Sequence, residues 1–576
     1  MPPSTSLALC LLLLVPTLSM AAKPARPPGN PTVVPTRPTV VVTLVVDQLA
    51  GWVAAERFEA LPATGGLARL RREGTWIREL EYAHANTETA PGHASLYTGF
   101  APTASGIFAN ELIGPDGQHI HLILDPEEKA LTPVDLPTTD TGSPAPSLKV
   151  LRVPTLADRL RAKTPGAYIV SLSGKDRGAL FAGGREPSAS LWFDPRRRMF
   201  ASSTGVMETF PKWAVDAGGP AAVAKAFDWK WEPLDPAWLA GVVKVVDDAP
   251  GEGDLGGYGK TFPHVASASK SPHQAWRAGP DVDRAVVDLA LAALEARPPD
   301  APVILLSLSF SGLDYVGHVF GADSHEHHDC LLRLDGQLKR LFDDLDVRFG
   351  ADGWSALLSG DHGVPPMPEA VSLRCPKTGD TDRFERSCEV GARLFEDPVT
   401  ADFKAAAVRD LGSADYIRGL VDPFVYLGPA ALVSEAETRR ALLWVRDYLR
   451  ARPEMHDAFI VRDLPSKCPS GDSALGHVCR SVPKDHPLLR NAVYMVPKRG
   501  YFWDAEWTPG GGAGHGTHWR YDRVVTLLAR SPGRIKRGQV VEKPAPFTTF
   551  TRTAASLLGI PLWREVKNAP RLVTGR

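Results

Sequence analysis

Six aspartate and histidine residues stand near the predicted ends of strands, and their side chains are of the types that bind metal ions. They are Asp47, Asp314, His318, Asp361, His362 and His515. A single aspartate at a strand end is usually a turn or capping residue. Six such residues point to a site, because ligands of open α/β sheets bind beyond the carboxyl ends of the strands. Mixed carboxylate and imidazole ligands favour zinc or a similar first-row ion.

A threonine segment supplies a candidate nucleophile. Thr89 opens the run Thr89-Ala90-Pro91-Gly92-His93, ahead of a helix-like stretch at 94–98. It would therefore lie near a helix N-terminus, where free amides and the helix dipole favour an anion. Taken alone, the simpler interpretation is an ordinary N-cap threonine. A threonine hydroxyl is a poor nucleophile near neutral pH, but a bound divalent metal would favour its alkoxide.

Buried strands alternating with amphipathic helices are predicted to position these residues. Strands buried on both faces are predicted at the apolar runs 40–46, 168–172, 303–308, 356–358 and 524–528. Helical patterns lie between them, for example at 281–296, at 330–349 and after the Ser434/Glu437 capping box. The alternation predicts an α/β fold, with a central, mostly parallel sheet and helices on both faces.

Two stretches interrupt this alternation. Residues 181–280 are rich in Trp, Gly and Pro, and residues 365–510 contain two cysteine pairs and a separate helix. We interpret both as cap segments inserted into one catalytic domain that spans 39–576.

The N-terminal segment is typical of an exported protein. An apolar run at 7–18 ends in Ser19-Met20-Ala21, which predicts a signal peptide at 1–22. No Lys or Arg precedes Leu7, so a membrane anchor is the alternative. The proline-rich stretch 23–38 is typical of an extended linker. No later stretch is apolar enough to span a bilayer. The expected location is therefore the periplasm or the extracellular space, without stable membrane insertion.

The cysteines agree with export. Cys375 with Cys388, and Cys468 with Cys479, are close pairs in loop-like sequence, and an oxidising compartment would allow each to form a local disulfide. Cys330 lies within a helical pattern and is predicted to be a buried thiol.

The composition is that of a globular protein with no nucleic-acid signature. Apolar residues make up 44% of the 576 residues and charged residues 23%, which excludes a disordered or fibrous chain. The net charge of -1 provides no basic excess for a nucleic acid. The oligomeric state is open, with a monomer favoured.

The ordered set of motifs resembles the alkaline phosphatase superfamily. The set is Val46-Asp47-Gln48, Thr89-Ala90-Pro91-Gly92-His93, Asn110, Asp314-Tyr315-Val316-Gly317-His318, Gly360-Asp361-His362-Gly363 and Gly514-His515-Gly516. Gly174-Lys175-Asp176-Arg177-Gly178 is similar to the Lys-x-Arg element of the phosphate-irrepressible (PafA-type) alkaline phosphatases, which use a threonine nucleophile. The resemblance covers most of the chain from about Val40 to Leu562. It departs from the pattern at Ser105, where relatives often have histidine, and in the glycine- and histidine-rich stretch 510–518.

The resemblance implies two zinc ions per chain. One would be held by Asp314, His318 and His515, and the other by Asp47, Asp361, His362 and Thr89. Two metal ions arranged in this way bind the attacking and leaving oxygens of an in-line displacement. Thr89 would attack phosphorus and form a phosphothreonine, which water then hydrolyses to release inorganic phosphate.

The resemblance also implies that Asn110, Lys175 and Arg177 bind the non-bridging phosphoryl oxygens. A monoester is a dianion with three terminal oxygens, whereas a diester has one charge and two such oxygens. Two cations beside the metals therefore favour small-molecule phosphate monoesters. Taken alone, Lys175-Asp176-Arg177 would be a solvated charged turn, but it follows a buried strand.

The remaining histidines are weaker candidates. His84 and His93 flank the threonine and are expected to pack or form hydrogen bonds. The run 325–329 has the composition of a metal cluster, but a polar first turn of a helix is the favoured interpretation.

The leading hypothesis is a secreted, zinc-dependent phosphate monoesterase. The nearest alternative is a phosphodiesterase or nucleotide pyrophosphatase on the same scaffold. The presence of Lys175 and Arg177 makes this alternative less favourable. A sulfatase requires a Cys or Ser nucleophile in a Cys/Ser-x-Pro-x-Arg motif, which the threonine segment does not supply. A catalytically inactive binding protein would be expected to lack a ligand or the nucleophile, and this chain has them all.

Overall fold

The computed structural model describes residues 38–133, 143–218, 229–374, 381–386, 388, 390–504 and 507–574. The predicted signal peptide and all but the last residue of the predicted linker lie outside these ranges. Within them, no helix has both the length and the apolar character needed to cross a bilayer.

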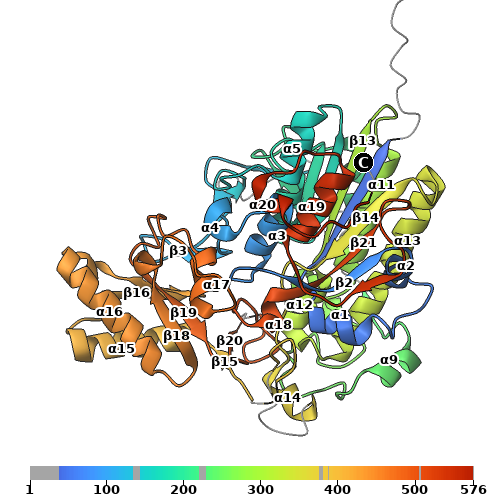
Figure 1. Cartoon of the computed structure of the whole chain (residues 1–576). Coiled ribbons are helices and arrows are strands. Elements are labelled where there is room, and N and C mark those ends of the chain that lie inside the picture. Colours follow the sequence, from blue (N-terminus) through green and yellow to red (C-terminus); the bar gives the residue numbers. More distant parts are fainter. Residues whose placement is uncertain are drawn as a thin grey trace, which may run out of the picture. The chain divides into compact units, whose positions relative to one another are not determined.

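A central sheet with the order β22-β2-β21-β14-β1-β13-β8-β9-β10-β6 organises the chain, and β23 pairs with β2 (Figure 1). Its inner strands β14, β1, β13, β8 and β9 are parallel to one another. The sheet strands are β1 (Thr39–Val46), β2 (Thr75–Glu81), β6 (Ala130–Leu131), β8 (Tyr168–Ser173), β9 (Ala189–Asp194), β10 (Met199–Ser203), β13 (Val303–Phe310), β14 (Trp354–Ser359), β21 (Val524–Arg530), β22 (Gln539–Val541) and β23 (Ala545–Pro546).

Strand β1 lies at the centre because its sequence suits burial on both faces. Seven of its eight residues, TVVVTLVV, are buried, and β-branched side chains pack well on a pleated surface. Val41 is in register with Leu305 of β13 on one side and with Ser355 of β14 on the other. The predicted α/β sheet with helices on both faces is confirmed.

Helices cover both faces of this sheet (Figure 1). Helices α3, α6 and α19 contact one another or the strands on one face, and α11, α12 and α13 pack together on the other. The helices around the sheet are α1 (Gly51–Arg57), α2 (Gly66–Glu73), α3 (Thr89–Thr98), α4 (Pro102–Ser105), α5 (Leu156–Lys163), α6 (Asp176–Gly183), α7 (Lys212–Gly218), α9 (Pro236–Val242), α10 (Pro272–Arg277), α11 (Asp281–Glu295), α12 (Gly312–Phe320), α13 (His325–Phe349), α18 (Arg520–Arg523), α19 (Thr548–Leu557) and α20 (Arg564–Lys567).

The sheet differs from the expectation in two respects. Strand β21 runs antiparallel to both β14 and β2, which needs no crossover helix. Strands β9 and β10, which lie inside the segment expected to be an insertion at 181–280, pair with each other and extend the sheet beyond β8. They are short and separated by a turn rich in arginine, so no alternating pattern marks them in the sequence.

A second hydrophobic core lies within the other expected insertion, 365–510. It is built on an antiparallel sheet of order β16-β17-β19-β18 and on two long helices. The elements of the segment 365–510 are α14 (Pro368–Arg374), β15 (Arg393–Leu394), α15 (Glu396–Leu411), β16 (Ile417–Val421), β17 (Phe424–Leu427), α16 (Glu435–Ala451), β18 (Met455–Ile460), α17 (Ala474–Ser481), β19 (Ala492–Pro497) and β20 (Phe502–Trp503). Of these, α14 and α17 pack on the main core instead. The Ser434 side chain accepts a hydrogen bond from the Glu437 amide at the start of α16, as the capping motif predicts.

The cysteine predictions are confirmed where the structure describes them. Cys468 and Cys479 form a disulfide with an S–S distance of 2.03 Å, and Cys330 is a buried free thiol in α13. The other expected pair includes Cys375, which lies outside the described residues.

Candidate active site

The six predicted ligands converge into two groups at one end of the central strands. Asp47 follows β1, Asp361 and His362 follow β14, and the remaining three residues come from α12 and from the loop before α18. Within each group, every residue places one ligand atom within 4.8 Å of the others. The first metal group is Asp314, His318 and His515. The second metal group is Asp47, Asp361 and His362.

The three imidazoles are oriented alike. Nδ1 of His318 lies 2.8 Å from the Ala513 carbonyl oxygen, Nδ1 of His515 lies 2.9 Å from that of Thr87, and Nδ1 of His362 lies 3.0 Å from that of Gly363. A carbonyl oxygen only accepts, so each Nδ1 must donate. In its neutral form each ring therefore presents Nε2 as an electron-pair donor, which is the arrangement of metal-binding histidines.

The polar atoms of the second group fit a bound cation. Both carboxylate oxygens of Asp47, Oδ2 of Asp361 and Nε2 of His362 are buried and make no hydrogen bond of suitable geometry with the described residues. Two of these oxygens still have close neighbours: Lys175 Nζ lies 2.7 Å from Oδ2 of Asp47, and His93 Nδ1 lies 3.0 Å from Oδ2 of Asp361. Nε2 of His362 does lie 3.2 Å from Oδ1 of Asp47, within ion-pair distance. Buried carboxylates are costly unless cations neutralise them, and the single Lys175 ammonium is shared between Asp47 and Asp314. The oxygen and imidazole donors suit a first-row divalent ion.

The pKa values reflect the crowding of charge. Burial and the nearby Asp314 carboxylate raise the pKa of Asp47, but Lys175 and His362 outweigh them and hold it well below the usual range. Burial lowers the pKa of His362, yet the surrounding carboxylates raise it to about 9. Burial and the neighbouring His362 lower the pKa of His515 to about 3. Three buried carboxylates thus share this small volume with few cationic side chains.

Thr89 is the first residue of α3, and it is buried. The first turn of α3 packs directly on Asp361. A Cβ atom added to Gly92 would lie 2.2 Å from the Asp361 carbonyl oxygen, so only glycine permits this approach. Nδ1 of His93 lies 2.9 Å from the Thr89 carbonyl oxygen and 3.0 Å from Oδ2 of Asp361. The helix start and the second metal group are therefore held together.

Asn110 is held by both neighbours of Thr89. Its backbone amide donates to the Glu88 carboxylate at 2.6 Å, and its side-chain oxygen accepts from the Ala90 amide at 3.0 Å. Because the oxygen is used in this way, the side-chain NH2 group remains as the donor available to a ligand.

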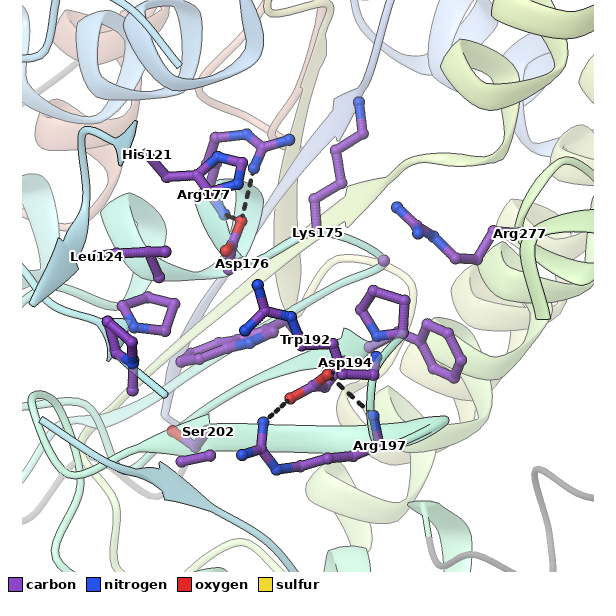
Figure 2. A pocket seen from close by; sticks show the side chains of 18 of the residues that line it. His121, Leu124, Lys175, Asp176, Arg177, Trp192, Asp194, Arg197, Ser202 and Arg277 are labelled. Atoms are coloured by element: carbon purple, nitrogen blue, oxygen red, sulfur yellow. Dashed lines mark hydrogen bonds and ion pairs between the residues drawn. The ribbon is translucent and has the colours of Figure 1, made fainter. Parts of the chain in front are cut away.

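Lys175 reaches the centre of the site. It is the N-cap residue of α6, directly beyond β8. Its ammonium nitrogen lies 2.7 Å from Oδ2 of Asp47 and 2.5 Å from Oδ2 of Asp314, and therefore contacts both metal groups. Arg177 is not brought into direct contact with these residues. Its guanidinium pairs with Asp176 at 3.0 Å and lines the adjoining cleft (Figure 2).

Gln48 is a site residue that sequence reasoning left without a role. Its side-chain amide donates to Oδ1 of Asp314 at 3.0 Å, and its backbone amide donates to Oδ1 of Asp361 at 3.2 Å, so one residue links the two groups. It adopts a left-handed conformation with φ of 64°. Its place directly after Asp47 was the only signal in the sequence.

The other histidines lie outside the two groups. His84 is buried beside the rings of Tyr82 and Phe547. The run 325–329 forms the start of α13, in agreement with the predicted first turn of a helix. Glu326 and His327 are nevertheless buried rather than solvated. Glu326 pairs with His264 at 3.0 Å, and Nδ1 of His327 lies 2.6 Å from a guanidinium nitrogen of Arg57.

The stretch 510–518 owes its glycines to close packing at the first group. A Cβ added to Gly512 would lie 2.1 Å from the His318 carbonyl oxygen. Gly516, directly after His515, has φ of 109°, which side chains rarely adopt. The departure from the expected pattern therefore allows this loop to carry His515 against α12.

Comparison with known proteins identifies relatives along most of the chain. The family model "Type I phosphodiesterase / nucleotide pyrophosphatase" matches residues 41–386. An alkaline phosphatase, PhoV, of Synechococcus elongatus is 32% identical over 64% of this chain and 67% of its own length. The alkaline phosphatase PafA of Elizabethkingia meningoseptica is 26% identical over 91% of this chain and 92% of its own length. A crystal structure of PafA shares the fold, with a TM-score of 0.77 and 23% identity over 91% of this chain and 96% of that one.

Proposed function

Because the chain belongs to the type I phosphodiesterase / nucleotide pyrophosphatase family, within the alkaline phosphatase superfamily, we propose that it hydrolyses phosphate monoesters and releases inorganic phosphate. It is a hydrolase of the alkaline phosphatase type. The observation that carries the proposal is the position of Lys175, whose ammonium lies between the two metal groups and 3.4 Å from the Thr89 hydroxyl.

Thr89 is the proposed nucleophile. Zinc ions held by the two groups would supply Lewis acidity, lowering the pKa of a bound hydroxyl and neutralising phosphoryl charge. The chain itself fixes the geometry of attack. Gly92 and His93 hold the start of α3 against Asp361, so the Thr89 oxygen is positioned before substrate arrives. A bond from this oxygen to phosphorus, with loss of the alcohol, produces a phosphothreonine that water hydrolyses.

Three side chains are proposed to bind the phosphoryl oxygens. Lys175 supplies charge beside Thr89, Asn110 supplies its side-chain NH2 group, and Arg177 supplies a guanidinium from the cleft. Fixed donors and cations of this kind stabilise the charge of the transferring group. Two cations match the dianion of a monoester better than the single charge of a diester.

A phosphodiesterase is the second candidate, and the description of the matching family favours it. The presence of both Lys175 and Arg177 favours the monoesterase. Initial rates of the zinc-loaded protein on three substrates with the same aryl group distinguish these activities. The substrates are the aryl phosphate, the methyl aryl phosphate diester and the aryl sulfate. We expect the largest kcat/KM on the monoester, and a larger value on the diester would overturn the proposal.

Export is part of the proposal. The Cys468–Cys479 disulfide is typical of an oxidising compartment, and the apolar run at 7–18 is typical of a signal peptide. Fractionation of the native host, with the protein detected by antibody, tests this. Recovery of the chain only in the cytosol, with Cys468 and Cys479 reduced, would contradict it.

A further inference from the structure

The cleft beside Lys175 contains more positive charge than one phosphoryl group requires. It has a volume of about 240 Å³ and is lined by Lys175, Arg177, Arg196, Arg197 and Arg277 (Figure 2). Two of these arginines are paired with acidic residues, Arg177 with Asp176 at 3.0 Å and Arg197 with Asp194 at 2.6 Å. Among the described residues, no carboxylate lies within ion-pair distance of Arg196 or Arg277.

Arg277 is held in place by aromatic rings. It is the last residue of α10, and its guanidinium lies 4.3 Å from the ring centre of Tyr315 and 5.2 Å from that of Trp507. It also donates to the Tyr315 hydroxyl. Its Nε is buried and has no hydrogen-bond partner among the described residues. The guanidinium is thus fixed by stacking, with donor capacity remaining.

Tyr315 connects this arginine to the catalytic end of the cleft. The Lys175 ammonium lies 4.8 Å from the centre of the same ring that Arg277 covers. Figure 2 shows Arg177 and Arg277 on opposite sides of Lys175. A phosphoryl group at Thr89 and Lys175 would therefore leave Arg277 within reach of the rest of a small substrate.

We propose that Arg277, with Arg196 at the rim, binds a second anionic group on the alcohol portion of the substrate. The preferred substrates are then small phosphate monoesters that also contain a carboxylate or a second phosphoryl group. A planar guanidinium with free donors suits either group. The inference rests on the proposed function, because it places the first phosphoryl group at Thr89.

Competitive inhibition by three phosphonates tests this subsite. Propylphosphonate carries one anionic group, whereas 3-phosphonopropionate adds a carboxylate and propane-1,3-bisphosphonate adds a second phosphoryl group. We expect at least one compound with a second anionic group to bind roughly tenfold more tightly than propylphosphonate, as one charge-assisted hydrogen bond would allow. Which compound binds better identifies the anion.

The variants separate charge from structure. R277Q keeps most of the packing surface and removes the charge. It should reduce the preference for the compound with a second anionic group over propylphosphonate to less than about threefold. R277K should keep part of the preference. R196Q, at an exposed position, should weaken it with little risk to folding. R198Q is the matched control, because Arg198 belongs to the same turn but does not line the cleft.

Two results would overturn the subsite. One is equal inhibition of the wild-type protein by all three compounds, and the other is a preference that survives both R277Q and R196Q. Calorimetric binding of the same phosphonates provides a readout that does not need turnover. If the protein hydrolyses no monoester but still binds a phosphonate with a second anionic group more tightly in a manner that depends on Arg277, the proposed function fails and the subsite stands.

Discussion

The ammonium nitrogen of Lys175 lies 3.4 Å from the hydroxyl oxygen of Thr89. The two residues are 86 positions apart and come from the starts of two different helices, α6 and α3. Those helices contact each other on one face of the sheet. The sheet therefore brings a cation to the candidate nucleophile, between two groups of metal-binding side chains.

Replacement of Thr89 by alanine is expected to abolish turnover without unfolding the protein. T89A removes only a hydroxyl and a methyl group from a helix start, so zinc content and melting temperature should change little. The monoesterase rate should fall by roughly 10³-fold or more, as it does when other nucleophiles are removed. Acid quenching during turnover of a ³²P-labelled monoester should leave label on Thr89.

T89S is the control, since it retains a hydroxyl and should retain measurable activity and labelling. Label on another residue, or nearly normal rates for T89A, would show that Thr89 is not the nucleophile.

The chain is expected to bind two zinc ions. Elemental analysis of untagged protein should find about two per chain, because the ligands form two separate groups. D361N should reduce the content toward one, since it weakens only the second group. D335N changes a buried carboxylate outside both groups and should retain both ions. One ion per chain, with activity insensitive to chelators, would contradict a two-metal mechanism.

Lys175 and Arg177 are expected to determine the preference for monoesters. Each charged hydrogen bond to a phosphoryl oxygen should contribute roughly 1.5–3 kcal/mol, or about one to two decades in rate. K175A/R177A should therefore lose more kcat/KM on an aryl monoester than on the matched diester, which has less charge and one terminal oxygen fewer.

The control for this pair is R185A, which removes a cation paired with Asp158 outside the cleft. It should leave the ratio of the two rates unchanged. If K175A/R177A lost kcat/KM equally on both substrates, the two residues would support the structure of the site without distinguishing a monoester from a diester by its charge.

Gly92 is expected to tolerate no side chain. G92A would place a methyl group 2.2 Å from the Asp361 carbonyl oxygen, so α3 must shift away from the second metal group. We expect a lower melting temperature together with a large loss of activity. G336A is the matched control, because Gly336 is also helical and a Cβ there would meet nothing within 4 Å. That variant should gain up to about 1 kcal/mol of stability, as helical glycine-to-alanine changes do. Full activity in G92A would show that the contact does not position Thr89.

His84 is expected to make stability depend on pH. Burial, assisted by Arg523 and Arg480, lowers its pKa to about 3, so it stays neutral in the folded protein. The unfolded chain takes up a proton near pH 6.5, and stability should therefore fall as the pH falls from about 6.5 to about 3. The contribution is about 1.4 kcal/mol for each pH unit.

Urea unfolding between pH 4 and 6 measures this effect. H84L should show a shallower dependence of the unfolding free energy on pH than the wild-type protein. H119Q, a change at an exposed histidine, should show the same dependence on pH as the wild-type protein. Identical slopes for H84L and the wild type would refute the role of His84.

The sequence alone predicted most of the central strands and selected polar residues that follow them. Runs of β-branched residues predict strands buried on both faces, and polar residues placed directly after them must lie at one edge of the sheet. Asp47, Asp361 and His362 could be selected for that reason, because each follows a strand within a few residues. The Cys468–Cys479 pairing could also be predicted, since the partners are only 11 positions apart.

Only the tertiary structure decided how distant segments meet. The antiparallel course of β21 and the addition of β9 and β10 depend on edge pairing, which leaves little periodicity in a short strand. The role of Gln48 depends on contacts with residues 266 and 313 positions away. Arg277 lies within a segment expected to be an insertion, and its position at Tyr315 of α12 follows from the packing of α10 and α12 against α11. Local sequence encodes local conformation and burial, whereas contacts of this range arise only when the sheet and its helices pack as a whole.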